Sequence, residues 1–244
     1  MSTILSEFIA EPGSIWSQSI VPLTNLGAKA RTDDGREFRY VREGTAANMV
    51  VGKLYQSGAE SAANWENISV AAAVAGATTV VSTSAVTLAV NVLAGGYLAV
   101  TTTTGEGYLY KIAGNTVAAA AAVTIYLEDP LQIALTAATS KVDVIPAPCG
   151  AAELWDASNH DGMILGVAVY PVTALYYGWV QTKGPATVLA DGGLTVGYLV
   201  VASNATDGAV EVAANASTEA QMPIGQAMEG VTTTEYGMVN LNIA

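Results

Sequence analysis

Val86-Thr87-Leu88-Ala89-Val90-Asn91-Val92 is the clearest patterned stretch in the chain, and it lies in a run from Glu66 to Glu106 that has no charged residue between its ends. In an extended chain its side chains divide into two alternating sets: Val86, Leu88, Val90 and Val92 on one side, and Thr87, Ala89 and Asn91 on the other. A period of two is typical of a strand with one buried face. We therefore expect an all-β fold whose uncharged surfaces are covered by other protein.

The same reasoning predicts further strands on both sides of this stretch. They are Thr78–Val81, Tyr97–Thr101, Gly107–Ile112, Val123–Leu127, Lys141–Ile145, Met163–Tyr170, Tyr176–Thr182, Leu194–Ala202, Gly208–Ala213, Ile224–Met228 and Tyr236–Ile243. Short strands separated by Gly, Asn and Asp are typical of a β-sandwich or a β-barrel. The segments 54–69 and 113–122 are expected to be loops.

The N-terminal part differs from the rest. Residues 1–28 predict an extended arm that carries Trp16, and Lys29 to Arg42 predict a hairpin because Asp34-Gly35 favours a tight turn. Pro146-Ala147-Pro148 marks a boundary further along. We expect an arm and hairpin at 1–60, a first β module at 61–146 and a second at 147–244.

The net charge of −12 argues against binding to nucleic acid or to an anionic membrane, since both need basic residues. Six of the nine basic residues nevertheless lie between Lys29 and Lys53. They form either a solvated hairpin with local ion pairs or an arm that docks on an acidic partner. On the second interpretation the partner-binding residues are Trp16, Arg31, Arg36, Arg39, Arg42 and Lys53.

Residues suited to catalysis or metal binding are few. The single histidine, His160, lies in a loop with Asp156 and Asp161, but the spacing is not that of a calcium loop, so we expect a plain turn. Nothing in the sequence brings the single cysteine, Cys149, to His160 as a nucleophile and base. Adjacent carboxylates such as Glu128 and Asp129 would face opposite sides of a strand. We expect no enzyme activity, no cofactor and no metal.

One cysteine excludes an intrachain disulfide, and the first residues lack the basic start of a signal peptide. We expect production in a bacterial cytoplasm. Tyr176, Tyr177 and Trp179 form an aromatic run. Such a run is a core or subunit interface in most cases, and a sugar-binding platform in others.

Several segments together resemble a known group. They are Ala28–Tyr40, Val51–Gln56, Gly105–Tyr108, Leu127–Leu131, Ser140–Asp143, Tyr177–Gln181, Gly184–Ala186, Leu165–Val169, Ala190–Leu194 and Met238–Leu241. They resemble small β-rich virion proteins of tailed bacteriophages, the capsid decoration or cement proteins. That resemblance implies a homotrimer bound to the major capsid protein on the outer surface of the virion, where it stabilises the shell.

Two other kinds of protein fit the composition. One is a carbohydrate-binding or hydrolytic β-sandwich on a phage tail, with Trp179 in its cleft. The other is a subunit of a tail tube or fibre.

Overall fold

The computed structural model describes residues 8–9, 13–58, 66–83, 87–119, 121–137, 139–159, 161–213, 223–232 and 234–243. The all-β prediction is confirmed, since strands make up 46% of the chain and helix only 3%. The helical part consists of two single-turn 3-10 helices, η1 (Ser14–Trp16) and η2 (Pro148–Gly150). His160 lies outside the described residues.

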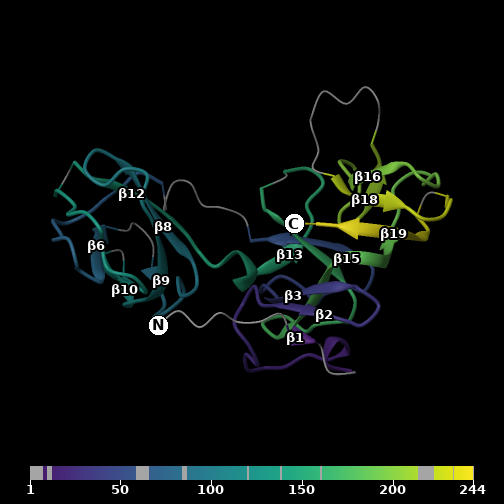
Figure 1. Cartoon of the computed structure of the whole chain (residues 1–244), viewed down its shortest axis with the longest axis horizontal. Helices are drawn as coiled ribbons and strands as arrows, with labels where there is room; N and C mark the ends of the chain where they lie inside the picture. Colours follow the sequence, from purple (N-terminus) through teal and green to yellow (C-terminus); the bar gives the residue numbers. More distant parts are fainter. Residues whose placement is uncertain are drawn as a thin grey trace. The chain divides into compact units, whose positions relative to one another are not determined.

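The chain folds into two compact units (Figure 1). The first unit combines residues 1–59 with residues 149–244, and the second unit is residues 60–148. The N-terminal segment, expected as a separate arm and hairpin, therefore shares a unit with the C-terminal module. The reason is strand pairing, because the second strand of its hairpin pairs with the first half of a long C-terminal strand.

An eleven-stranded sheet that curls into a half-barrel forms the first unit. Its main path runs in the order β1-β2-β3-β15-β19-β18-β16-β17, and β14, β4 and β13 branch from β15. The strands are β1 (Phe8–Ile9), β2 (Lys29–Arg31), β3 (Glu37–Arg42), β4 (Leu54–Ser57), β13 (Ala152–Leu154), β14 (Ile164–Ala168), β15 (Tyr177–Leu189), β16 (Leu199–Ala202), β17 (Val210–Val212), β18 (Pro223–Ala227) and β19 (Tyr236–Asn242).

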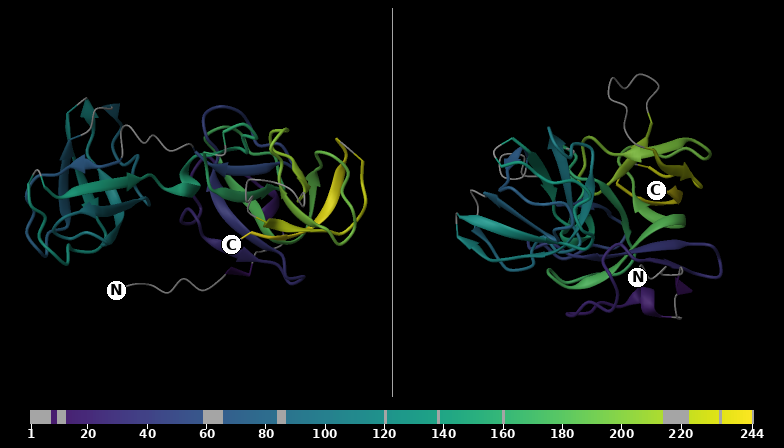
Figure 2. Two further views of the ribbon diagram at one scale, coloured as in Figure 1. Left: turned by 90° about the horizontal axis from the view of Figure 1, so that it is seen from above. Right: turned by 60° about the vertical axis from the view of Figure 1, so that its left-hand side comes forward.

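The long strand β15 joins the two halves of this sheet. It pairs antiparallel with β3 from Tyr177 to Lys183, and with β19 from Lys183 to Leu189. Strands β1 to β3 therefore lie at one end of the unit, and β16 and β18 lie at the other (Figure 1, Figure 2). Each half has its own apolar core, one around Val188, Val239 and Ile224 and the other around Val41 and Leu165.

A six-stranded sheet in the order β5-β12-β8-β9-β11-β6 forms a nearly closed barrel in the second unit. A bridge between Val70 and Ser82 brings its two end strands together. The strands are β5 (Ile68–Ser69), β6 (Thr79–Thr83), β8 (Tyr97–Thr102), β9 (Leu109–Asn115), β11 (Ala122–Leu127) and β12 (Lys141–Ile145), with a separate pair β7 (Thr87–Leu88) and β10 (Ala118–Ala119).

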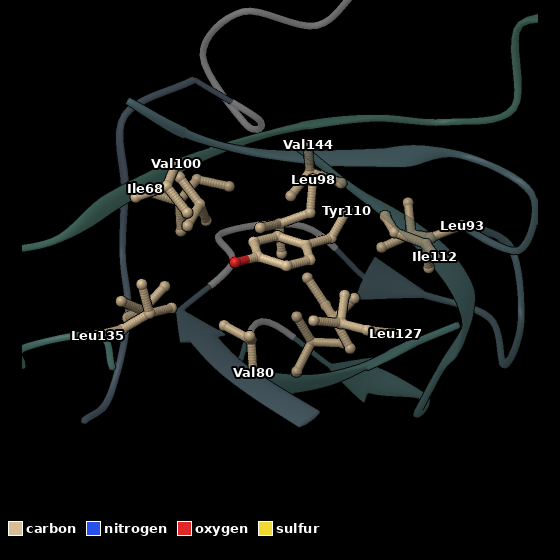
Figure 3. Close-up of a cluster of buried hydrophobic side chains, with 14 of the residues drawn as sticks. Ile68, Val80, Leu93, Leu98, Val100, Tyr110, Ile112, Leu127, Leu135 and Val144 are labelled. Atoms are coloured by element: carbon tan, nitrogen blue, oxygen red, sulfur yellow. The ribbon is translucent and has the colours of Figure 1, made fainter. Parts of the chain in front are cut away.

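The barrel interior is filled by alternate side chains of these strands, as the period of two predicts. Leu98, Val100, Val142 and Val144 are all buried. Tyr110 points its ring among them, and its hydroxyl accepts the backbone N–H of Gln132 at 3.1 Å (Figure 3). The Tyr110 hydroxyl is therefore hydrogen-bonded although its ring lies in an apolar cluster.

The strand expected at Val86–Val92 is mostly wrong. Strand β7 covers only Thr87 and Leu88 of the expected strand. Leu88 is buried, whereas Val90 and Val92, which were expected on the same buried face, are 64% and 51% exposed. The chain turns here instead, because the carboxamide of Asn115 binds the turn on both sides. It accepts the N–H of Leu93 at 2.9 Å and donates to the carbonyl of Ala89 at 3.0 Å.

Candidate protein-binding surface

Two of the predicted partner-binding residues, Trp16 and Arg36, line the same groove. The groove has a volume of about 220 Å³ and is also lined by Val51, Val169 and Met238. Trp16 is 48% exposed, and Val51 and Met238 are exposed to a similar degree. An exposed tryptophan and an arginine beside apolar side chains are the residue types that dominate binding energy at protein interfaces.

Local structure fixes Trp16 at the surface. Gly13, at a φ of 94°, starts the single turn η1, and the N–H of Trp16 donates to the carbonyl of Gly13 at 3.1 Å. The preceding residue, Ile15, is buried and packs with Ala30 and Phe38. Because Ile15 anchors the turn in the core, the neighbouring tryptophan is held outside it.

Arg36 is held by the hairpin turn that the sequence predicted. Its Nε donates to Asp34 at 2.8 Å, and its guanidinium lies 5.7 Å from the centre of the Phe38 ring. Asp34 also accepts the hydroxyl of Thr32, and this bond, followed by those from Arg36, lowers the pKa of Asp34. The arginine is therefore oriented before any partner binds, which reduces the entropy lost on binding.

A second, wider hollow of about 680 Å³ adjoins the first, and Pro185 lines both. The strand register explains why. Pro185 lies opposite Asn240 on β19, Asn240 lies opposite Gln226 on β18, and Gln226 lies opposite Leu199 on β16. These side chains form an exposed row across the outer face of the sheet.

We call this area the Pro185 surface. It comprises Trp16, Arg36, Val51, Lys183, Pro185, Thr187, Leu199, Gln226, Met238, Asn240 and Asn242. Its two cations are already paired within the molecule, Arg36 with Asp34 and Lys183 with Glu37 at 3.3 Å. The rest of the surface is apolar or carries amides, so a protein partner would remove few charges from water on binding.

Strand addition is blocked beside this surface. Beyond Lys183, β3 no longer pairs with β15, so the carbonyls of that edge need other donors. The buried amide of Gln181 donates to the carbonyls of Lys183 and Pro185, at 3.0 and 2.8 Å. Pro185 has no N–H to offer. A partner would therefore contact side chains here and would not extend the sheet.

The other four predicted partner-binding residues lie elsewhere in the first unit. Arg31 is exposed on β2, and Arg39 lies half-buried on β3. Arg42 donates to the carbonyl of Leu175 at 3.3 Å and lies over the ring of Tyr177. Lys53 packs its stem beside Gly208. The structure thus brings Trp16 and Arg36 together and does not add these four to their groove.

The aromatic run is largely used inside the molecule. The Tyr40 ring stacks on Tyr177 at 6.0 Å between centres and is tilted against Trp179 at 4.9 Å. Trp179 also packs against the cluster that contains Phe38, and Tyr176 packs against the cluster that contains Val41. A role for these three residues in a subunit interface stays a prediction.

Among the described residues, no group of three or more His, Cys, Asp or Glu side chains is arranged to hold a metal. The Cys149 thiol is buried, and burial raises its pKa, so it is a weak nucleophile near neutral pH. Asp156 accepts the backbone N–H groups of Ser158 and Asn159, as in a plain turn.

A buried carboxyl group, Glu43, stands out in the first unit. It is 3% exposed, and its Oε2 has no hydrogen-bond partner in the described part of the chain. Burial, and to a lesser degree the charge of Glu153, raises the pKa of Glu43 to about 8. The group is therefore protonated at neutral pH, and it gave no signal in the sequence that would separate it from the other glutamates.

Protein-family models, curated proteins and solved structures contain no match to this chain. Among the described residues, neither 3-10 helix has the length or hydropathy to cross a membrane.

Proposed function

We propose that this chain is a structural protein of a tailed-phage virion that decorates the outer capsid surface and stabilises the shell by protein–protein contacts. Its partner is the major capsid protein, and its copies act as homotrimers, as the resemblance implies. In this proposal it takes part in no catalysis, holds no cofactor and contacts neither nucleic acid nor membrane.

The observation that carries the proposal is the Pro185 surface. It is broad, hollowed and poor in unpaired charge, and a tryptophan and a preoriented arginine lie at its side. Apolar area removed from water contributes roughly 2.5 kcal/mol per 100 Å² before the costs of ordering. Modest contacts of this size become effective on a shell, because many copies bind a repetitive surface together.

The carbohydrate alternative receives less support from the site. It needs exposed ring faces beside carboxylates, whereas Tyr177 and Trp179 place their rings against Tyr40. The wider hollow is lined by amides, glycines and prolines together with Asp34, Lys183 and two leucines, and no aromatic side chain is among its lining residues.

The test is co-sedimentation of the purified full chain with emptied capsids of the phage that encodes it. We expect saturable binding that the double variant Trp16→Ala, Met238→Ser weakens at least tenfold, since truncating one aromatic anchor typically costs 2 kcal/mol or more. The matched control is Tyr108→Ala, Val74→Ser, which removes one exposed aromatic and one exposed aliphatic side chain from the second unit. Equal binding by wild type and the double variant would contradict the assignment of this surface.

A further inference from the structure

A second polar site surrounds Gln56, on the other branch of the first unit. Gln56 lies on β4 between two neighbouring strands, opposite Glu153 of β13 and Ile164 of β14. It is 2% exposed. A carboxamide so deeply buried needs partners for both its nitrogen and its oxygen.

Among the described residues only half of that requirement is met. The Nε2 of Gln56 donates to Oδ1 of Asp161 at 2.8 Å. The Oε1 of Gln56 is buried and has no hydrogen-bond partner. An unpaired buried acceptor is unfavourable, and it points to a bound group beyond the described residues.

Glu153 lies on the same side of the sheet as Gln56, because directly opposed residues of an antiparallel pair share a face. Its carboxylate lies beside two glycines. A Cβ atom on Gly44 or on Gly58 would each lie 3.7 Å from Oε1 of Glu153. A Cβ atom on Gly162 would lie 3.0 Å from the carboxamide carbon of Gln56, so larger residues there would crowd the site.

The two carboxylates that flank Gln56 have no basic partner in the described parts of the chain. The ion pairs found there are Arg36 with Asp34, Lys111 with Glu128, and Lys183 with Glu37. Asp161 therefore places a carboxylate at the Gln56 side chain and Glu153 places another on the same face, and neither forms an ion pair with Lys or Arg among the described residues.

We propose that Glu153, Asp161 and the Oε1 of Gln56 bind a divalent cation, and that calcium is the ion that fits. All three ligands are oxygens, which suits a hard cation and not zinc or copper. Calcium accepts six to eight oxygens in flexible geometry, so waters complete the shell, whereas magnesium demands a nearly ideal octahedron. The ion gives the orphaned oxygen its partner and links β4, β13 and the segment that precedes β14.

With two carboxylates and one amide the site belongs to the weak class, with dissociation constants of about 10⁻⁴ to 10⁻³ M. It acts on the stability of the first unit and does not depend on capsid binding. A chain that does not bind calcium could still bind capsids, and a chain that does not bind capsids could still bind calcium.

Terbium luminescence tests the site on the full chain, since Trp155 lies two residues from Glu153 and can sensitise a bound Tb³⁺ ion. We expect a saturable signal that millimolar Ca²⁺ displaces and equal Mg²⁺ displaces at least fivefold less well. The melting temperature of the first unit should rise by about 3 °C when Ca²⁺ is raised to ten times its dissociation constant.

The variants Glu153→Gln and Asp161→Asn should each lose the saturable signal and the Ca²⁺-dependent shift. In EDTA both should melt at or above the wild-type temperature, because each removes one uncompensated charge, so loss of binding is separable from misfolding. The control Glu235→Gln changes an exposed glutamate of the same unit and should keep the full response. A wild type that shows neither response, or variants that respond as the wild type does, would overturn the proposal.

Discussion

Replacing Glu43 by glutamine should remove a large part of the pH dependence of stability in the first unit. In the folded chain burial raises the pKa of Glu43 to about 8, compared with 4.5 for an ordinary glutamate. A raised pKa means that the folded state holds the proton more tightly than the unfolded state. The stabilisation is therefore complete below pH 4.5 and is lost as the pH rises towards 8.

The magnitude follows from the size of the shift. Each pKa unit corresponds to about 1.4 kcal/mol, so the full loss amounts to about 4 to 5 kcal/mol, and about 4 kcal/mol of it falls between pH 5 and pH 8.5. Two neighbours in the same core do not titrate over this range. Burial raises the pKa of Tyr55 to about 12 and also raises the pKa of Cys149 above its usual value.

Urea denaturation at several values from pH 5 to pH 8.5 measures the effect, with tryptophan fluorescence as the probe because Trp16, Trp155 and Trp179 all belong to the first unit. We expect Glu43→Gln to match the wild type near pH 5 and to exceed it by several kcal/mol at pH 8.5. The control Glu235→Gln should follow the wild-type curve, since hydrogen bonds from Thr232 lower the pKa of Glu235 and it is ionised throughout. Parallel curves for wild type and Glu43→Gln would refute the reasoning.

Three further substitutions test other parts of the structure. Asn115→Ala removes the hydrogen bonds to Leu93, Ala89 and Thr116. Calorimetry should show that the free energy of unfolding of the second unit falls by about 2 to 4 kcal/mol. A loss below about 0.5 kcal/mol would contradict the role of Asn115 in that turn. Gly52→Ala should lower the free energy of unfolding of the first unit by about 2 to 4 kcal/mol in urea denaturation, because φ is 76° and the new Cβ would lie 2.6 Å from the Tyr236 ring. Gly76→Ala measures the backbone part of that loss, since Gly76 has a φ of 88° and open space around it. Gln181→Met keeps the side-chain volume but frees the carbonyls of Lys183 and Pro185, so size-exclusion chromatography should show concentration-dependent association into species larger than the wild-type oligomer.

The sequence predicted strands well where one face is buried and the other is wet. Strand β12 begins and ends at the predicted residues, and the alternation of Leu98 and Val100 in β8 is the pattern that the period of two expects. The hairpin around Asp34-Gly35 is confirmed by β2 and β3. The local sequence was enough to predict these elements, because the turn residues and the alternation of side chains indicate the same structure.

Strand β4 was expected to be a loop, and the reason is its central position. All four residues of β4 are buried, so its sequence shows no alternation between a solvent-exposed face and a buried face. Strand β15 continues past its predicted end at Thr182, through Gly184 and Pro185. The sequence contains no sign that the Gln181 amide satisfies the open carbonyls there, since that contact depends on the folded edge.

The candidate surface was only partly predictable. Trp16 and Arg36 stood out by residue type, but Val51, Pro185 and Met238 are ordinary residues that become a groove through the pairing of β15 with β19. The orphaned oxygen of Gln56 is likewise invisible in a sequence, because its burial depends on β13 and β14 on either side.

The most direct test of the account is electron cryo-microscopy of intact virions that contain this chain. We expect density for the first unit on the outside of the shell, with the Pro185 surface, including Trp16 and Met238, against the major capsid protein. Density inside the shell or on the tail alone, or a first unit whose Pro185 surface faces solvent in every copy, would contradict the central claim.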